Sequence, residues 1–126
     1  MSAPLPTFDE PEIARAVERL SPEDLHALPF GVVRVDEEGT TRLFNAAEAN
    51  LSGYGDRPAL GRGFFTEVAP CMNNPSFLGR IERARAAGQL DIEFDYVGDF
   101  DDRDKELRVR VQSAGGGGYW IFIDRN

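Results

Sequence analysis

The second half of the chain carries hydrophobic residues at every other position, as a half-buried sheet requires. Between residues 90 and 96 the apolar side chains alternate with acidic ones, which is the clearest period of two in the sequence. Residues 107–111 repeat the alternation with Arg between the apolar positions. Residues 119–123, YWIFI, are apolar throughout, so we expect a strand that is covered on both faces.

The first half predicts one hairpin and several helices. Strands over Gly31–Asp36 and Thr40–Phe44 are joined by a turn at Glu37–Gly39. Short polar residues that precede helical apolar spacing predict the starts of helices. These predicted starts are Asp9 and Ser21 for two short helices, Asn45 for a helix over NAAEANLS, and Asn74-Pro75 for the longest helix, which Gly88 ends.

The order of these elements predicts an α+β fold with a five-stranded antiparallel sheet of PAS type and flanking helices. Helices from the middle of the chain would cover one face of the sheet. The two N-terminal helices would cover the other face as a cap. We therefore expect a single domain, with residues 1–28 as the N-terminal helical cap and residues 29–126 as the PAS core.

Composition narrows the function. The 126 residues carry a net charge of −8, which argues against binding to nucleic acid. No apolar run approaches the ~18 residues that a membrane span needs. With one Cys and one His, the chain has no internal disulfide and no structural zinc site. We expect a cytoplasmic protein without a metal, either a monomer or a weak dimer.

The lone cysteine, Cys71, ends the segment FFTEVAPC. Pro70 pushes Ala69 towards extended geometry, so a helical turn should stop there and leave Cys71 on a turn beside the core. Such a thiol suits covalent attachment. On these residues alone, however, a lone cysteine near apolar neighbours is more often a buried small hydrophobe.

Five segments in one order resemble the photoactive yellow protein family of blue-light receptors. The segments are FGVVRVDEEG, FNAAEANLSG, GRGFFTEVAPC, NPSFLGR and YWIFI. The resemblance implies a p-coumaric acid (4-hydroxycinnamoyl) chromophore held as a thioester on Cys71. It also implies that protonated Glu48 hydrogen-bonds the phenolate, that the hydroxyl of Ser52 supports it, and that light drives isomerisation and proton transfer from Glu48. The N-terminal helices would then loosen and signal to an unidentified downstream protein.

The pocket that this resemblance implies is lined by Phe44, Tyr54, Phe64, Ala69 and Pro70. Three of the implied positions depart from the family. Phe44 stands where the family has a tyrosine that donates a second hydrogen bond to the phenolate. Tyr54 stands where the family has an arginine lid, and Gly98 replaces an aromatic residue of the wall.

Two alternatives stay open at this point. Asn45 and Glu48 also fit a capping box, which is a purely structural role for the carboxylate. The whole domain could be a PAS sensory or protein-interaction module that binds no pigment. An enzyme is not expected, because Cys71 and Glu48 have no partnering histidine to form a nucleophile–base pair.

Overall fold

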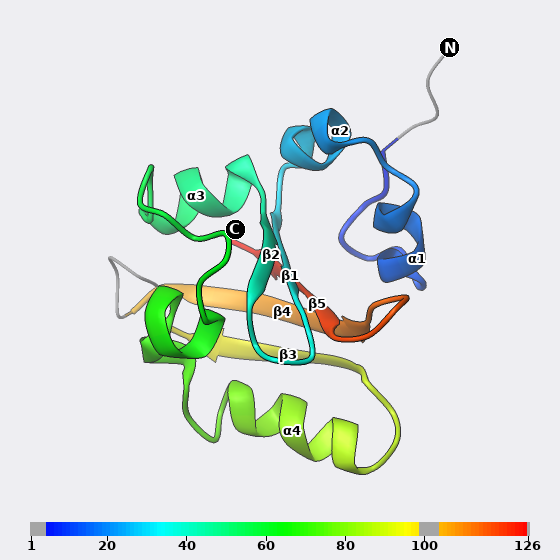
Figure 1. Cartoon of the computed structure of the whole chain (residues 1–126), viewed down its shortest axis with the longest axis vertical. Helices are drawn as coiled ribbons and strands as arrows, with labels where there is room; N and C mark the ends of the chain where they lie inside the picture. Colours follow the sequence, from blue (N-terminus) through cyan, green and yellow to red (C-terminus); the bar gives the residue numbers. More distant parts are fainter. Residues whose placement is uncertain (1–4, 99–103, 126) are drawn as a thin grey trace.

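The computed structural model describes residues 5–98 and 104–125 and confirms the predicted α+β architecture (Figure 1). Its five strands form one antiparallel sheet in the order β2-β1-β5-β4-β3. The strands are β1 (Gly31–Val35), β2 (Thr41–Phe44), β3 (Asp91–Val97), β4 (Glu106–Ser113) and β5 (Tyr119–Asp124). The helical segments are α1 (Ile13–Glu18), α2 (Pro22–Ala27), α3 (Ala46–Ser52), the π-helical turn η1 (Phe64–Val68), the 3-10 turn η2 (Pro70–Met72) and α4 (Leu78–Ala86).

Strand β5 lies at the centre of the sheet and is covered on both faces, as its sequence predicts. Its alternate residues enter two separate apolar clusters. Tyr119, Ile121 and Ile123 face the first, and Trp120 and Phe122 face the second. Burying successive side chains on opposite faces is possible only because the period of a strand is two.

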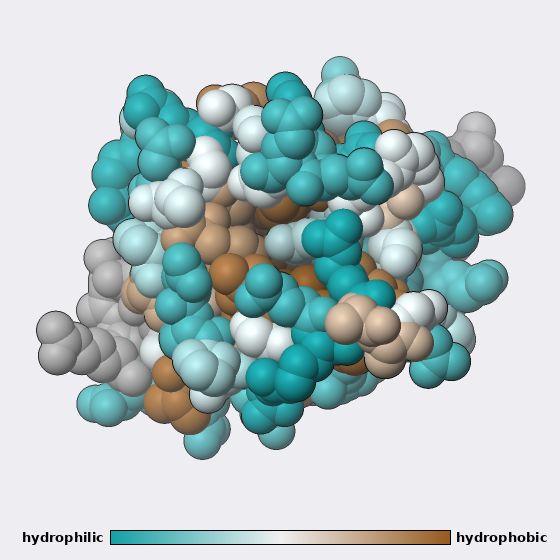
Figure 2. Space-filling view, turned by 60° about the horizontal axis from the view of Figure 1, so that its bottom comes forward, coloured by the Kyte–Doolittle hydropathy of each residue, from teal (hydrophilic) through white to brown (hydrophobic). Residues whose placement is uncertain are grey.

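The first cluster, here the α4-side cluster, lies between the sheet and the segments η1, η2 and α4. Its fully buried members include Phe64, Ala69, Phe77 and Ile81. A shallow pocket near it lies between the β1–β2 turn, η1 and α4, with Phe65 and Tyr119 in its lining. When the bottom of Figure 1 is turned towards the viewer, hydrophobic residues gather in a central hollow ringed by hydrophilic ones (Figure 2).

The second cluster, here the cap-side cluster, joins the N-terminal helices to the other face of the sheet. Ile13, Val17 and Leu25 pack there against β5. The carboxylate of Glu18 accepts hydrogen bonds from the indole nitrogen of Trp120 and from the backbone of Gly115, both at 2.8 Å. Apolar burial and these polar contacts together hold the cap in place.

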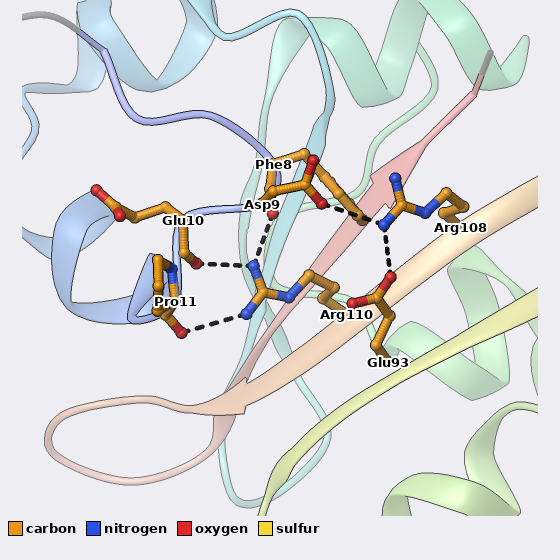
Figure 3. A network of polar contacts seen from close by, with 7 residues as sticks. All are labelled: Phe8, Asp9, Glu10, Pro11, Glu93, Arg108 and Arg110. Atoms are coloured by element: carbon orange, nitrogen blue, oxygen red, sulfur yellow. Dashed lines mark hydrogen bonds and ion pairs between the residues drawn. The ribbon is translucent and has the colours of Figure 1, made fainter.

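Two arginines of β4 bind the segment before α1 (Figure 3). The guanidinium of Arg110 donates to the carbonyls of Phe8 and Glu10 at 2.7 Å and to that of Pro11 at 3.2 Å. Arg108, which is more exposed, pairs with Asp9 at 3.1 Å and with Glu93 at 2.6 Å. Arg110 therefore holds the backbone of the segment, whereas Arg108 holds a side chain.

The predicted helix start at Asp9 is wrong, since α1 begins at Ile13 with Glu12 at its N-cap. The Asp9 carboxylate is engaged by Arg108, and the carbonyls of Glu10 and Pro11 accept from the guanidinium of Arg110 instead of closing a helical turn. The start at Ser21 is confirmed, because its hydroxyl accepts from the Asp24 amide at 3.2 Å.

Helix α4 begins later than Asn74-Pro75 because the Asn74 side chain forms a local turn. Its Oδ1 accepts from the amides of Ser76 and Phe77 at 2.9 and 3.1 Å. The helix ends as predicted, with Gly88 at a φ of +82°. Among residues 5–98 and 104–125, no helix has the length and apolarity to cross a bilayer.

Candidate functional site

Helix α3 is fixed at its start by Asn45, a buried residue whose side chain is fully engaged. Its Oδ1 accepts from the amides of Glu48 at 3.0 Å and Val32 at 2.9 Å. Its Nδ2 donates to the carbonyls of Leu25 at 2.9 Å and Phe30 at 3.1 Å. One amide thus ties α2, β1 and α3 together, so the position of Glu48 is set by contacts far apart in sequence.

Only half of a capping box forms at this helix. The Asn45 side chain accepts from the Glu48 amide, but the Asn45 amide donates to the carbonyl of Val32 at 3.0 Å. The Glu48 carboxylate turns instead to Arg125, whose Nη1 and Nη2 donate to Oε1 at 2.6 Å and to Oε2 at 3.0 Å. The carboxylate therefore has a role other than closing the helix end.

The Glu48–Arg125 pair is a two-pronged ion pair taken out of water. The side chains are 0% and 1% exposed, respectively. Planar guanidinium and carboxylate groups match in this geometry, which is the strongest form of such a pair. Losing one partner of a buried pair leaves an uncompensated charge and is typically destabilising by about 3–5 kcal/mol.

Gly31 makes room for this pair on β1. A Cβ at this position would lie 2.0 Å from Oε1 of Glu48 and 3.1 Å from Nη1 of Arg125. The carboxylate is therefore packed directly against the backbone of the strand. Gly31 pairs with Ile123 of β5, and Arg125 follows two residues later. Any side chain at position 31 would expel the carboxylate.

Beyond α3 the chain turns around Tyr54, which is buried. Its amide donates to the hydroxyl of Ser52 at 3.1 Å, and its own hydroxyl donates to the carbonyl of Pro58 at 2.8 Å. The ring of Phe44 lies 5.2 Å from that of Tyr54. The guanidinium of Arg57 lies 4.4 Å from the centre of the Tyr54 ring on a cation–π contact.

Cys71 lies on the 3-10 turn η2, directly after the buried π-helical turn η1. Ala69 leaves helical geometry with φ −131° and ψ 60°, as the following proline requires. Cys71 is exposed, so the interpretation as a buried hydrophobe is wrong. Its carbonyl accepts from Asn74 Nδ2 at 3.0 Å and from the Tyr96 hydroxyl at 3.1 Å. Two side chains outside the turn, one from the following loop and one from β3, therefore hold its backbone.

The structure brings together some of the predicted site residues. Phe44 and Tyr54 are in contact, and Ser52 supports the backbone of Tyr54. Phe64 and Ala69 are buried in the α4-side cluster, whereas Pro70 and Cys71 are on the surface. Gly98 is described and donates to the carbonyl of Lys105 at 2.8 Å. Residues 99–103, which follow it, lie outside the described residues.

Sequence reasoning missed Arg125, Arg57 and Tyr96. For Arg125 one signal exists. Positions 119, 121 and 123 face the α4-side cluster, so the alternation along the strand predicts that position 125 faces the same side of the sheet. A cation there would need a buried partner, but nothing in the sequence identifies Glu48, which is 77 residues away. Arg57 carries no local pattern that separates it from an ordinary surface residue. Tyr96 lies on the apolar side of the alternation over residues 90–96, but nothing in that pattern indicates its hydrogen bond to the carbonyl of Cys71.

The sequence of this chain is similar to the PAS fold family and to photoactive yellow proteins. The PAS fold family matches residues 24–124. The photoactive yellow protein of Rhodothalassium salexigens is 34% identical over 119 residues, which cover 94% of this chain and 95% of the relative.

Solved structures agree with this result. The photoactive yellow protein domain of the sensor histidine kinase Ppr from Rhodospirillum centenum is 38% identical. It superposes with a TM-score of 0.79, covering 90% of this chain and all of that domain. A PAS domain from Colwellia psychrerythraea shares the fold alone, at 14% identity and a TM-score of 0.60, covering 82% of this chain and 92% of that one.

Proposed function

Because this chain belongs to the photoactive yellow protein family and has the PAS fold, we propose that it is a blue-light receptor. It carries a 4-hydroxycinnamoyl group as a thioester on Cys71. Two observations support this proposal: the exposed Cys71 on η2 and the buried carboxyl of Glu48 on α3. Tyr54, which follows α3, and Phe64 of η1, which precedes η2, both lie in the α4-side cluster.

The residues at this site are chemically suited to a covalently attached 4-hydroxycinnamoyl group. An exposed thiol on a proline-bounded turn can be acylated, and the contacts from Asn74 and Tyr96 hold the turn while this happens. Aromatic side chains at positions 44, 54 and 64 supply an apolar wall. When bound, the group supplies a double bond that light isomerises and a phenolic oxygen that accepts a proton.

In this proposal Glu48 is the proton donor. A carboxylic acid can donate to a phenolate only while it is protonated, and burial favours the neutral form. Ser52 holds the backbone of Tyr54, and Tyr54 shields the site with Arg57 stacked on its ring. Phe44 packs beside Tyr54 but has no hydroxyl to donate. The phenolate therefore has one donor fewer than in relatives with tyrosine.

Loosening of the N-terminal cap is the proposed output. Local opening starts in the least stable elements, and α1 and α2 are helices of six residues each. Their release would expose the cap-side face of the sheet to a signalling partner. The role is sensory rather than catalytic, and we propose a cytoplasmic protein that is a monomer or a weak dimer.

Intact mass and absorbance test this function together. Incubation with an activated p-coumaric acid ester should add one acyl group and create a visible band that bleaches under blue light. Cys71→Ala should take up no group and keep the same far-ultraviolet circular dichroism. Labelling of Cys71→Ala, or labelled wild type without a light response, would contradict the proposal.

The Glu48–Arg125 pair favours a second candidate, a PAS interaction module without pigment. A carboxylate that is already paired with a guanidinium has no need of a phenolate partner. In that case the wild type would remain unlabelled under the conditions above, and its cap would respond to a protein partner alone.

A further inference from the structure

Glu48, the proposed proton donor, forms an ion pair with Arg125. Donation of a hydrogen bond to the phenolate in the dark state does not explain this pair. A carboxylate held by two guanidinium nitrogens is ionised and cannot donate a hydrogen bond to a phenolate. Attachment of the pigment would have to break this pair and protonate Glu48. The pair nevertheless has well-formed geometry and is excluded from water. Such an arrangement requires a second, ionised state of Glu48.

We propose that Arg125 is the counter-ion of Glu48 whenever that carboxyl is ionised. Glu48 pairs with Arg125 in the pigment-free protein and again after light-driven proton transfer, and it leaves Arg125 only in the pigmented dark state. The pigment-free half of this inference stands on the structure alone. The light-driven half rests on the function proposed above.

The position of the pair supports two discrete arrangements. Gly31 leaves a space against β1 that fits the carboxylate and would not fit a Cβ. Arg125 reaches this space from the end of β5, on the side of the sheet that faces the α4-side cluster. Helix α3 is fixed by Asn45, so the change between the two partners needs only rotation of the Glu48 side chain.

The proton transfer balances without any other group. The O–H bond of the Glu48 carboxyl breaks, an O–H bond forms on the phenolate oxygen, and the net charge of the site does not change. The product carboxylate would be costly if it stayed alone in an apolar interior. Arg125 removes that cost, so it stabilises the state after transfer and prolongs its lifetime.

The pigment-free protein provides the first test, by infrared spectroscopy at neutral pH. The carbonyl stretch of a protonated carboxyl is assigned to Glu48 by its loss in Glu48→Gln. We expect the wild type to lack this band and Arg125→Gln to show it, because burial favours the protonated form of a carboxyl that has lost its counter-ion. Arg125→Lys keeps the positive charge and should lack the band.

The matched control is Arg62→Gln, which removes an exposed arginine from a 3.7 Å pair with Glu67 and should also lack the band. A Glu48 carbonyl band in the pigment-free wild type would overturn the inference, as would its absence from Arg125→Gln. If Arg125→Gln does not fold, the double variant Glu48→Gln/Arg125→Gln should fold, since it removes both charges of the pair. Failure of both would show that pairing is not what Arg125 supplies.

The pigmented protein provides the second test. Arg125→Gln should shorten the lifetime of the bleached state at least tenfold, which corresponds to about 1.4 kcal/mol, while Arg62→Gln should leave it unchanged. An unaltered lifetime in Arg125→Gln would refute the light-driven half. Failure of the wild type to take up pigment would refute the proposed function and leave the pigment-free result standing. The two ideas can therefore fail separately.

Discussion

Arg110 offers a direct test of what holds the N-terminal cap on the sheet. Its side chain is buried, at 7% exposure, and donates three hydrogen bonds to carbonyls of the segment before α1 (Figure 3). Arg110→Met keeps an unbranched side chain of similar length and removes all three bonds. The carbonyls of Phe8 and Glu10 would then lose this donor, whereas the carbonyl of Pro11 would keep its hydrogen bond from Gln112 Nε2 at 2.9 Å.

The magnitude follows from the geometry. A hydrogen bond to a charged group contributes about 1.5–3 kcal/mol. The total is smaller than the sum of three such bonds for two reasons. Only one guanidinium is desolvated for all three bonds, and the carbonyls bind water again when the segment detaches. We therefore expect the free energy of cap opening to fall by about 2–4 kcal/mol. At 1.36 kcal/mol per factor of ten, opening becomes roughly 30- to 900-fold more frequent.

Amide hydrogen exchange at Ala14 measures this opening, because that amide donates to Gln112 Oε1 at 2.9 Å only while the cap is docked. The matched control is Arg108→Met, which removes an arginine of the same strand that is 39% exposed and binds the side chain of Asp9. Pairs this exposed are worth about 1 kcal/mol or less, so exchange should rise about fivefold at most.

Two results would refute this reasoning. Exchange at Ala14 in Arg110→Met could stay within fivefold of the wild type, which would mean that the apolar contacts of the cap-side cluster suffice. Alternatively, Arg108→Met could accelerate exchange as much as Arg110→Met. Docking would then depend on charge in general, and added salt should reproduce the effect.

Three further predictions use other contacts. In the pigmented protein, Phe44→Tyr should restore a donor to the phenolate, shift the anion band to shorter wavelength and lower the pKa of the phenol; a titration with the same band and midpoint would contradict it. Burial raises the pKa of Glu18, but hydrogen bonds from Gly115 and Trp120 outweigh it and hold the pKa below its ordinary value of 4.5. Its stabilising contribution is thus present above that value and lost as pH falls through the lowered pKa, so Glu18→Gln should flatten the acid side of the stability curve followed by Trp120 fluorescence. Thr41 is fully buried with its hydroxyl unbonded among the described residues, so Thr41→Val should raise the free energy of unfolding by ~1 kcal/mol in urea denaturation.

The sequence alone determined the elements whose signals are local. The alternation along β3 and β4, the double burial of β5 and the caps at Ser21 and Asn45 are readable because each depends on neighbouring residues. The turn at Cys71 is readable for the same reason, since Pro70 restricts the residue before it.

Only the tertiary structure decided which side chains act on segments far away in the chain. Asp9 fails as a cap because β4 contributes Arg108 and Arg110, about one hundred residues later. The carboxylate of Glu48 leaves the helix end because β5 brings Arg125 beside it. Propensities predict the conformation of a residue from its neighbours in the sequence. A buried charge instead pairs with whichever group the fold brings within hydrogen-bonding distance, and that group can be far away in the sequence.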